Sequence, residues 1–352
     1  MQITPEVSGK IKLLRLPLII GIVTIHSYIN PVGYADKFFQ TFISSTWGGC
    51  CVPFLFSLSG FLFFRNFNLS LNSYLEKLKS RFWTLLVPYL FWNLALAAMV
   101  IIVLNIPATS SFIQGHYKKY IGDYTFANFI DCLTGYRSGY PIAFHFWYVR
   151  DLIEMVILSP VFLLVARKIP YLGLALFAAP WLLNLQLGFI KIQWLGPLFF
   201  YLGCLIAVQK LDLTWLNRRK NLIIGIYLAM AVVLAIIKTS EIENFPQHLF
   251  ECCTIVVGTM AIWCASDLIT GKLQKVCLNL SGLAFFVYAS HEPMLAVLNG
   301  SFQKLSKTPN SITVMVQYLL VVIIATLLTL AAGSLLQRYT PKFFQVITGA
   351  RG

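Results

Sequence analysis

The chain has 352 residues, of which 58% are hydrophobic and 11% are charged, and its mean hydropathy is +0.75. A soluble domain of this length does not need so much apolar surface, so the composition excludes an ordinary soluble protein and indicates a helical membrane protein. The formal net charge is +14. Because the basic residues fall in short loops between apolar runs, membrane topology accounts for this charge, and we expect no nucleic-acid partner.

About ten membrane-spanning helices are predicted from apolar windows of about 19 residues, which makes the fold class all-α and polytopic. The fifth and sixth spans meet near Lys191 and can also be read as one kinked unit. We expect residues 1–352 to form a single membrane domain with no appended soluble domain. The predicted spans are Ile11–Ile29, Trp47–Phe64, Phe82–Ile106, Phe144–Ala166, Pro170–Ile190, Ile192–Gln209, Leu222–Ile237, Leu249–Ile269, Leu280–Leu298 and Ile312–Leu336.

The first predicted span starts like a signal peptide, with Lys10, Lys12 and Arg15 ahead of an apolar core. No small-residue cleavage site follows that core, because the chain runs on into Asn30 and Pro31. We therefore expect this segment to be retained as the first helix.

Lysine and arginine residues concentrate in alternate loops, and this distribution sets the orientation. The opposite loops carry fewer cations and hold acidic residues such as Asp36 and Glu241. The positive-inside rule then places both termini in the cytoplasm. The cations of the predicted cytoplasmic side are Lys10, Lys12, Arg65, Lys77, Lys79, Arg81, Arg167, Lys168, Lys210, Arg218, Arg219, Lys220, Lys272, Lys275, Arg338 and Lys342.

Two ionisable residues of the first span, Arg15 and His26, are separated by ten residues. At about 1.5 Å rise and about 100° per residue, they lie ~16 Å apart on the same face of the helix. Ionisable groups in a membrane usually face the protein interior or a wet cavity. His26 is either a helix–helix hydrogen bonder or a base reachable from outside. Arg15 either snorkels to lipid headgroups or binds the phosphate of a cytoplasmic cofactor.

The longest connection, residues 107–143 on the predicted outer side, is rich in Tyr, Gly and Ser. A loop of this length is usually a lid, a binding element or a disordered segment. Its tyrosines suit an interfacial aromatic belt equally well. The composition leaves both readings open.

The fourth predicted span opens with a polar cluster. Arg150 and Glu154 are four residues apart, so they can pair along one helix face, and Asp151 lies on a neighbouring face. One reading is an internally neutralised cluster that ties helices together. That reading explains His145 less well, because His145 lies at the outer entrance beside Trp147.

The ninth span carries His291 and Pro293, and the second span carries Ser59 and Gly60. His291 is either a packing partner or a contact to substrate or cofactor, and the small residues of the second span suit close helix packing. The eight cysteines show no C-x-x-C pattern, so we predict neither a metal site nor a required disulfide.

Taken in order along nearly the whole chain, these segments resemble the membrane-bound acyltransferase family 3, a group of bacterial integral-membrane O-acyltransferases. The most specific element is the R-x10-H pattern formed by Arg15 and His26. The other segments similar to motifs of that family are Ser57–Phe63, Lys79–Arg81 with Leu86–Tyr89, His145–Leu152 and Ser290–Pro293.

The resemblance implies an O-acetyltransferase of the bacterial inner membrane. Its donor would be acyl-CoA, expected to be acetyl-CoA, on the cytoplasmic side, and its acceptor a hydroxyl of a cell-envelope glycan or lipid-linked sugar. His26 is expected to act as general base or as a transient acyl carrier, and Arg15 to bind CoA phosphate. The further candidates are His145, Asp151 and His291 for catalysis, Arg65, Arg81 and Ser59 for donor binding, and Trp147, Arg150 and Glu154 for acceptor binding.

A different class of function also fits the residues. Basic and histidine side chains in a membrane cavity suit a transporter or flippase of lipid-linked sugars or small anions. Donor dependence distinguishes the two, because only an acyltransferase releases free CoA from acetyl-CoA when an acceptor is present.

Overall fold

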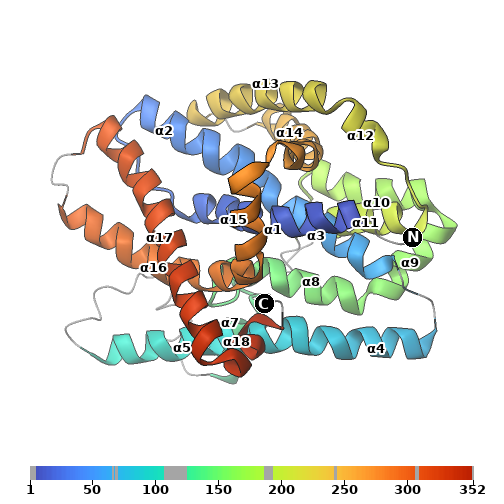
Figure 1. The fold of residues 1–352 in the computed structure, drawn as a ribbon, viewed down its shortest axis with the longest axis horizontal. Coiled ribbons are helices and arrows are strands. Elements are labelled where there is room, and N and C mark those ends of the chain that lie inside the picture. Colours follow the sequence, from blue (N-terminus) through green and yellow to red (C-terminus); the bar gives the residue numbers. More distant parts are fainter. Residues whose placement is uncertain are drawn as a thin grey trace. The chain divides into compact units, whose positions relative to one another are not determined.

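The computed structural model describes residues 5–65, 67, 70–106, 125–185, 193–241, 244–305 and 309–350. Every regular element in these ranges is a helix, which confirms the predicted all-α class (Figure 1). The predicted outer loop is described only from residue 125 onwards, and the predicted break at Lys191 lies outside the described residues.

Five helical segments are long and apolar enough to cross a membrane, and two apolar helices, Pro170–Leu182 (α10) and Leu195–Val208 (α11), are shorter. Helix α1 (Pro5–His26) is not among the five, because a span of this kind holds at most two charged residues in 18. Every 18-residue stretch of α1 contains at least three, namely Lys10, Lys12 and Arg15. The count of ten spans and the cytoplasmic location of both termini stay predictions. The five segments are Tyr34–Phe64, Leu71–Val103, Lys220–Thr239, Phe245–Leu268 and Ser311–Tyr339.

The predicted fourth span, drawn as one helix, is divided in the structure. It consists of a 3-10 turn at Phe144–Phe146 (η4), helix α8 (Trp147–Ile157) and helix α9 (Ser159–Lys168). Pro160 explains the division, because it has no N–H to donate to the preceding turn but is well placed in the first turn of a new helix.

The chain forms two compact units, which are described separately. Unit 1 comprises Met1–Asn66 and Phe199–Pro341, and unit 2 comprises Phe67–Leu198 and Lys342–Arg351. The single domain expected from the sequence stays a prediction.

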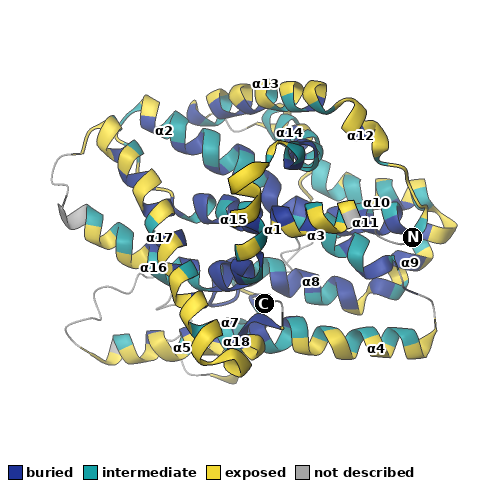
Figure 2. Ribbon diagram, viewed as in Figure 1, coloured by how far each residue is buried: buried dark blue, intermediate teal, exposed yellow. Residues whose placement is uncertain are grey.

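Helix α1 is central to unit 1. It packs against the π-helical turn η1 (Phe42–Gly48) and the elements α3 (Gly49–Phe64), α15 (Gly271–Leu280), α16 (Ala284–Leu305) and α17 (Ser311–Tyr339). Leu14, Leu18 and Ile22, spaced four apart, are at most 3% exposed. Figure 2 shows buried stretches along the ribbon of α1. Burial on this stripe anchors the helix that carries Arg15 and His26.

The other helices of unit 1 complete the surroundings of α1. Helix α2 (Tyr34–Thr41) runs into η1 and packs on α17, and α16 and α17 lie side by side (Figure 1). Helices α13 (Lys220–Thr239) and α14 (Phe245–Ala265) form a second close pair. The remaining elements are α11, α12 (Thr214–Arg218), η5 (Ser266–Leu268) and η6 (Ser281–Leu283).

Unit 2 is built from α4 (Leu71–Arg81), the π-helical turn η2 (Phe82–Leu86) and α5 (Val87–Asn105), followed by α7 (Phe126–Thr134), α8, α9 and α10. Helix α18 (Pro341–Thr348) packs on α5, where the indole of Trp92 donates to the carbonyl of Ile347. Helix α7 and the loop after it pack on α5 and position the segment that contains His145.

Candidate active site

The structure brings together two predicted site residues that are distant in sequence. His26 is the last residue of α1, and His291 lies on α16. Their ring centroids are 5.3 Å apart and their planes are inclined by 38°. His26 is half-buried and His291 is completely buried. An imidazole can accept and hold a proton, so this pair inside unit 1 is a candidate acid–base group.

The backbone defines the tautomer of His291. Its Nδ1 lies 2.6 Å from the carbonyl oxygen of Tyr288, so Nδ1 carries the hydrogen and donates it. In the neutral ring, Nε2 then holds the lone pair that can act as a base or accept a hydrogen bond. This hydrogen bond from the ring to the carbonyl of Tyr288, three residues earlier, therefore fixes the orientation of the His291 ring.

Arg15 lies on the same continuous helix as His26, so the spacing of ~16 Å expected for a regular α-helix applies. Its side chain is exposed, and among the described residues it forms no ion pair. Lys10, one turn earlier, is instead held by Asp267, with 2.6 Å between Nζ and Oδ1, and lies 5.5 Å from the centroid of Trp263. Among the described residues, Arg15 and the exposed Lys12 are thus the cations of this end of α1 that remain accessible to an external anion, and only Arg15 carries a guanidinium.

The small residues of α3 serve close helix packing. A Cβ placed on Gly60 would overlap the carbonyl oxygen of Phe200, and one on Gly203 would overlap that of Ser57. The backbones of α3 and α11 therefore meet at van der Waals distance. Ser59 lies half-buried beside this contact, and Arg65 caps the end of α3 through its N–H to the carbonyl of Phe61.

The polar cluster predicted on the fourth span is present in unit 2. Arg150 donates to the carboxylate of Asp151 through Nε and Nη2, each at 2.8 Å. Its Nη1 donates to the carbonyl oxygens of Thr134 and Gly139 at 3.0 and 3.2 Å. Glu154 lies farther from the guanidinium, at 3.8 Å, and accepts a hydrogen bond from the hydroxyl of Tyr136. Arg150 thus links α8 to the loop that precedes His145.

Three further side chains hold the segment between α7 and His145, and of these only Tyr89 belongs to a segment that resembles a family motif. Asp131 accepts hydrogen bonds from the N–H groups of Arg137 and Ser138. The amide oxygen of Asn93 accepts from the N–H of Ala143, and the hydroxyl of Tyr89 donates to the carbonyl of Leu133. The described part of the predicted outer loop is therefore a fixed structure. No local pattern predicts the bonds of Asn93 and Tyr89, because each joins positions that only the fold brings together.

The remaining predicted residues lie at separate places in unit 2. His145 is 3% exposed and contacts the ring of Phe146, with 4.9 Å between centroids. Trp147, half-buried, begins α8. Arg81 is half-buried at the junction of α4 and η2. The roles proposed for these residues remain predictions.

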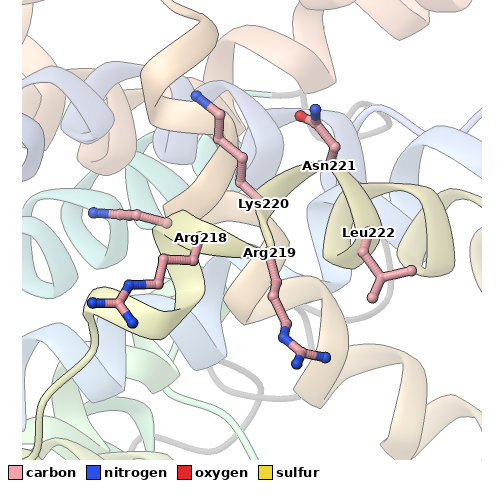
Figure 3. A pocket seen from close by; sticks show the side chains of 6 residues that line it. Arg218, Arg219, Lys220, Asn221 and Leu222 are labelled. Carbon is pink, nitrogen blue, oxygen red and sulfur yellow. The ribbon is translucent and has the colours of Figure 1, made fainter.

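A pocket of about 300 Å³ lies elsewhere in unit 1, at the turn between α12 and α13. It is lined by residues 217–222, including Arg218, Arg219 and Lys220. Figure 3 shows that the side chains of Arg219 and Lys220 point in opposite directions, so they do not converge on a common ligand. This basic turn matches the concentration of cations expected in a cytoplasmic loop.

Among the described residues, no group of three or more His, Cys, Asp or Glu side chains could hold a metal ion. The eight cysteines are free, and seven of them are buried. Buried thiols of this kind pack as small apolar side chains.

Comparison with known proteins identifies the family. A family model described as an acyltransferase domain, acyltransferase family 3, matches residues 9–337. The chain is also 27% identical, over 362 residues, to the succinoglycan biosynthesis protein ExoH of Rhizobium meliloti (strain 1021), covering 98% of this chain and 93% of that protein. No solved structure matches the chain. The chain therefore belongs to acyltransferase family 3 and is an integral-membrane acyltransferase.

Proposed function

We propose that this acyltransferase is an O-acetyltransferase of the bacterial inner membrane that moves an acetyl group from acetyl-CoA to a hydroxyl of a cell-envelope glycan or lipid-linked sugar. The observation that carries the proposal is the approach of His26 to His291, with 5.3 Å between ring centroids. The relative named for succinoglycan biosynthesis supports a glycan as acceptor.

In the proposed reaction, His26 takes the proton of the acceptor hydroxyl while the oxygen of that hydroxyl attacks the thioester carbonyl. The carbon–sulfur bond breaks, the acetyl group stays on the sugar oxygen, and the imidazolium of His26 returns the proton to the departing thiolate. The products are an acetylated glycan and CoA with a free thiol. His291 lies against His26 and, with its Nδ1 hydrogen held by Tyr288, can support the imidazole of His26 through this cycle.

Arg15 is proposed to bind a phosphate of the donor. It is exposed and unpaired among the described residues, and a guanidinium offers paired donors that match phosphate geometry. The ~16 Å between Arg15 and His26 along a regular helix is comparable with the pantetheine arm of CoA. The nucleotide could then stay at one end of α1 while the thioester reaches the other.

Further roles are proposed for residues of both units. His145 and Asp151 would orient catalytic groups, Arg65, Arg81 and Ser59 would contribute to donor binding, and Trp147, Arg150 and Glu154 would contact the acceptor. Arg150 would in addition hold the segment before His145 in place, through its bonds to the carbonyl oxygens of Thr134 and Gly139.

The test uses the full chain in lipid nanodiscs with acetyl-labelled acetyl-CoA and envelope glycan as acceptor. We expect release of free CoA thiol and transfer of label to glycan, both lost in His26→Ala. His248→Ala is the matched control, because His248 lies on a different helix, α14, where its Nε2 faces the thiol of Cys252. Normal transfer by His26→Ala refutes the proposal.

A further inference from the structure

The end of α1 that presents His26 is held by polar side chains, one from Ser27 directly after the helix and the others from neighbouring helices. The last four carbonyls of a helix have no partner within the helix, and a membrane offers little water to satisfy them. Here the hydroxyl of Ser27 donates to the carbonyl of Val23 at 2.7 Å. The hydroxyl of Tyr318, on α17, donates to the carbonyl of Thr24 at 3.0 Å. Two of the four carbonyls are therefore fixed in place by side chains.

The chain immediately after His26 is fixed by Gln40 of α2. The amide oxygen of Gln40 accepts from the N–H of Ile29 at 2.8 Å, and its amide nitrogen donates to the carbonyl of Ile29 at 3.0 Å. One side chain thus satisfies both backbone polar groups of a single residue. Asp36, one turn earlier on α2, accepts from the N–H of Val32 and from the hydroxyl of Ser311.

These side chains are fully buried. Gln40, Tyr318 and Asp36 are each 0% exposed. Burying a polar group is costly unless its hydrogen bonds are made, so their presence inside unit 1 calls for a specific use. The bonds of Gln40 and Tyr318 all end on backbone groups within three residues of His26, on both sides of it.

We propose that Gln40 and Tyr318 are positioning residues that set the orientation of His26 relative to His291. The inference rests on the proposed role of His26 as base. Helix ends fray unless their terminal groups are tied down, and a base must stay within about 2.6–3.2 Å of the proton it removes. Clamping the backbone at Thr24 and Ile29 confines the His26 side chain to the geometry that faces His291.

The variants Tyr318→Phe and Gln40→Met remove these bonds while keeping side-chain volume close to the original. Since a 1 Å displacement of a reacting group can cost about 10²-fold in rate, we expect kcat to fall ~10-fold in Tyr318→Phe and ~100-fold in Gln40→Met. The KM for acetyl-CoA should not change, because the proposed phosphate contact lies at the other end of α1. Tyr227→Phe is the matched control, since its hydroxyl meets the thiol of Cys50 on α3 rather than α1.

A second measurement does not depend on activity. The chain contains five histidines, so imidazole NMR signals of 15N-histidine-labelled protein in nanodiscs can be assigned by single substitutions. The signal lost in His26→Ala should shift or broaden in Tyr318→Phe and Gln40→Met and stay unchanged in Tyr227→Phe. Should Gln40→Met not fold, Gln40→Glu, which keeps the acceptor for the Ile29 N–H, takes its place.

The outcomes separate this inference from the proposed function. Unchanged kcat and an unchanged His26 signal in both variants overturn the inference while leaving His26 as base. An equal loss of kcat in Tyr227→Phe points to general packing and also overturns it. Full activity in His26→Ala instead refutes the proposed function, whatever the His26 signal shows in Tyr318→Phe and Gln40→Met.

Discussion

Arg150 and Asp151 are adjacent in sequence and form an ion pair in which Nε and Nη2 of Arg150 both lie 2.8 Å from one carboxylate oxygen, Oδ1, with side chains only 8% and 9% exposed. The same guanidinium binds two carbonyl oxygens of the preceding loop. The pair therefore links α8 to the loop that leads into His145.

Replacing Asp151 by Leu should destabilise the protein strongly. The substitution leaves the Arg150 guanidinium buried without its carboxylate, and breaking such a pair from one side costs about 3–5 kcal/mol. Thermal unfolding in detergent, followed by tryptophan fluorescence, measures the effect. Glu154→Gln serves as the control, because Glu154 is 39% exposed and lies 3.8 Å from the guanidinium. The unfolding temperature of the Glu154→Gln variant should hardly change. Equal unfolding temperatures for both variants contradict the prediction.

Replacing His291 by Ala should lower kcat while leaving the amount of inserted protein unchanged. The His291 ring contacts His26, so its loss frees the imidazole to rotate; we expect a ~10–100-fold decrease, smaller than the ~10²–10⁴-fold decrease typical of removing a general base. Release of CoA thiol measures kcat for His291→Ala, His26→Ala and the control His248→Ala. An inactive His248→Ala would show that the assay reports damage to histidines in general.

Replacing Gly203 by Ala should destabilise unit 1. The added methyl group overlaps the carbonyl oxygen of Ser57, so α11 and α3 must move apart, and overpacking of this kind typically costs about 1–3 kcal/mol. Gly225→Ala is a matched control on α13, where nothing lies within 4 Å of the new Cβ. Alanine there should be neutral or stabilise by about 0.5–1 kcal/mol, because glycine is a poor helix former. Thermal unfolding of the two variants should therefore move in opposite directions.

The sequence predicts the helical class and the close packing of α3, because each depends on local pattern. It also predicts a first helix, as Ile11–Ile29, whereas α1 begins at Pro5 and ends at His26. The division of the fourth span at Pro160 was missed, since an apolar window ignores the lost N–H of a proline. The contact of His26 with His291 and the bonds from Gln40 and Tyr318 were beyond reach, because they join helices far apart in the chain. Periodicity shows which face of a helix is apolar, and tertiary packing decides which partner meets it.

Replacing Arg15 by Gln should raise the KM for acetyl-CoA with little change in kcat. A hydrogen bond to a charged group contributes about 1.5–3 kcal/mol, which corresponds to a ~10–100-fold increase in KM. Acetyl-dephospho-CoA, which lacks the 3′-phosphate, identifies the group that Arg15 contacts. If Arg15 binds that phosphate, the unsubstituted protein should have a higher KM for the truncated donor than for acetyl-CoA. The Arg15→Gln variant should have the same KM for both donors. Lys12→Gln is the control, because Lys12 is also exposed on α1, three residues before Arg15, and its removal lowers the positive charge at this end of the helix while keeping the Arg15 guanidinium. Should Arg15→Gln and Lys12→Gln raise KM equally, the effect comes from the general positive field at this end of α1, and the specific contact is excluded.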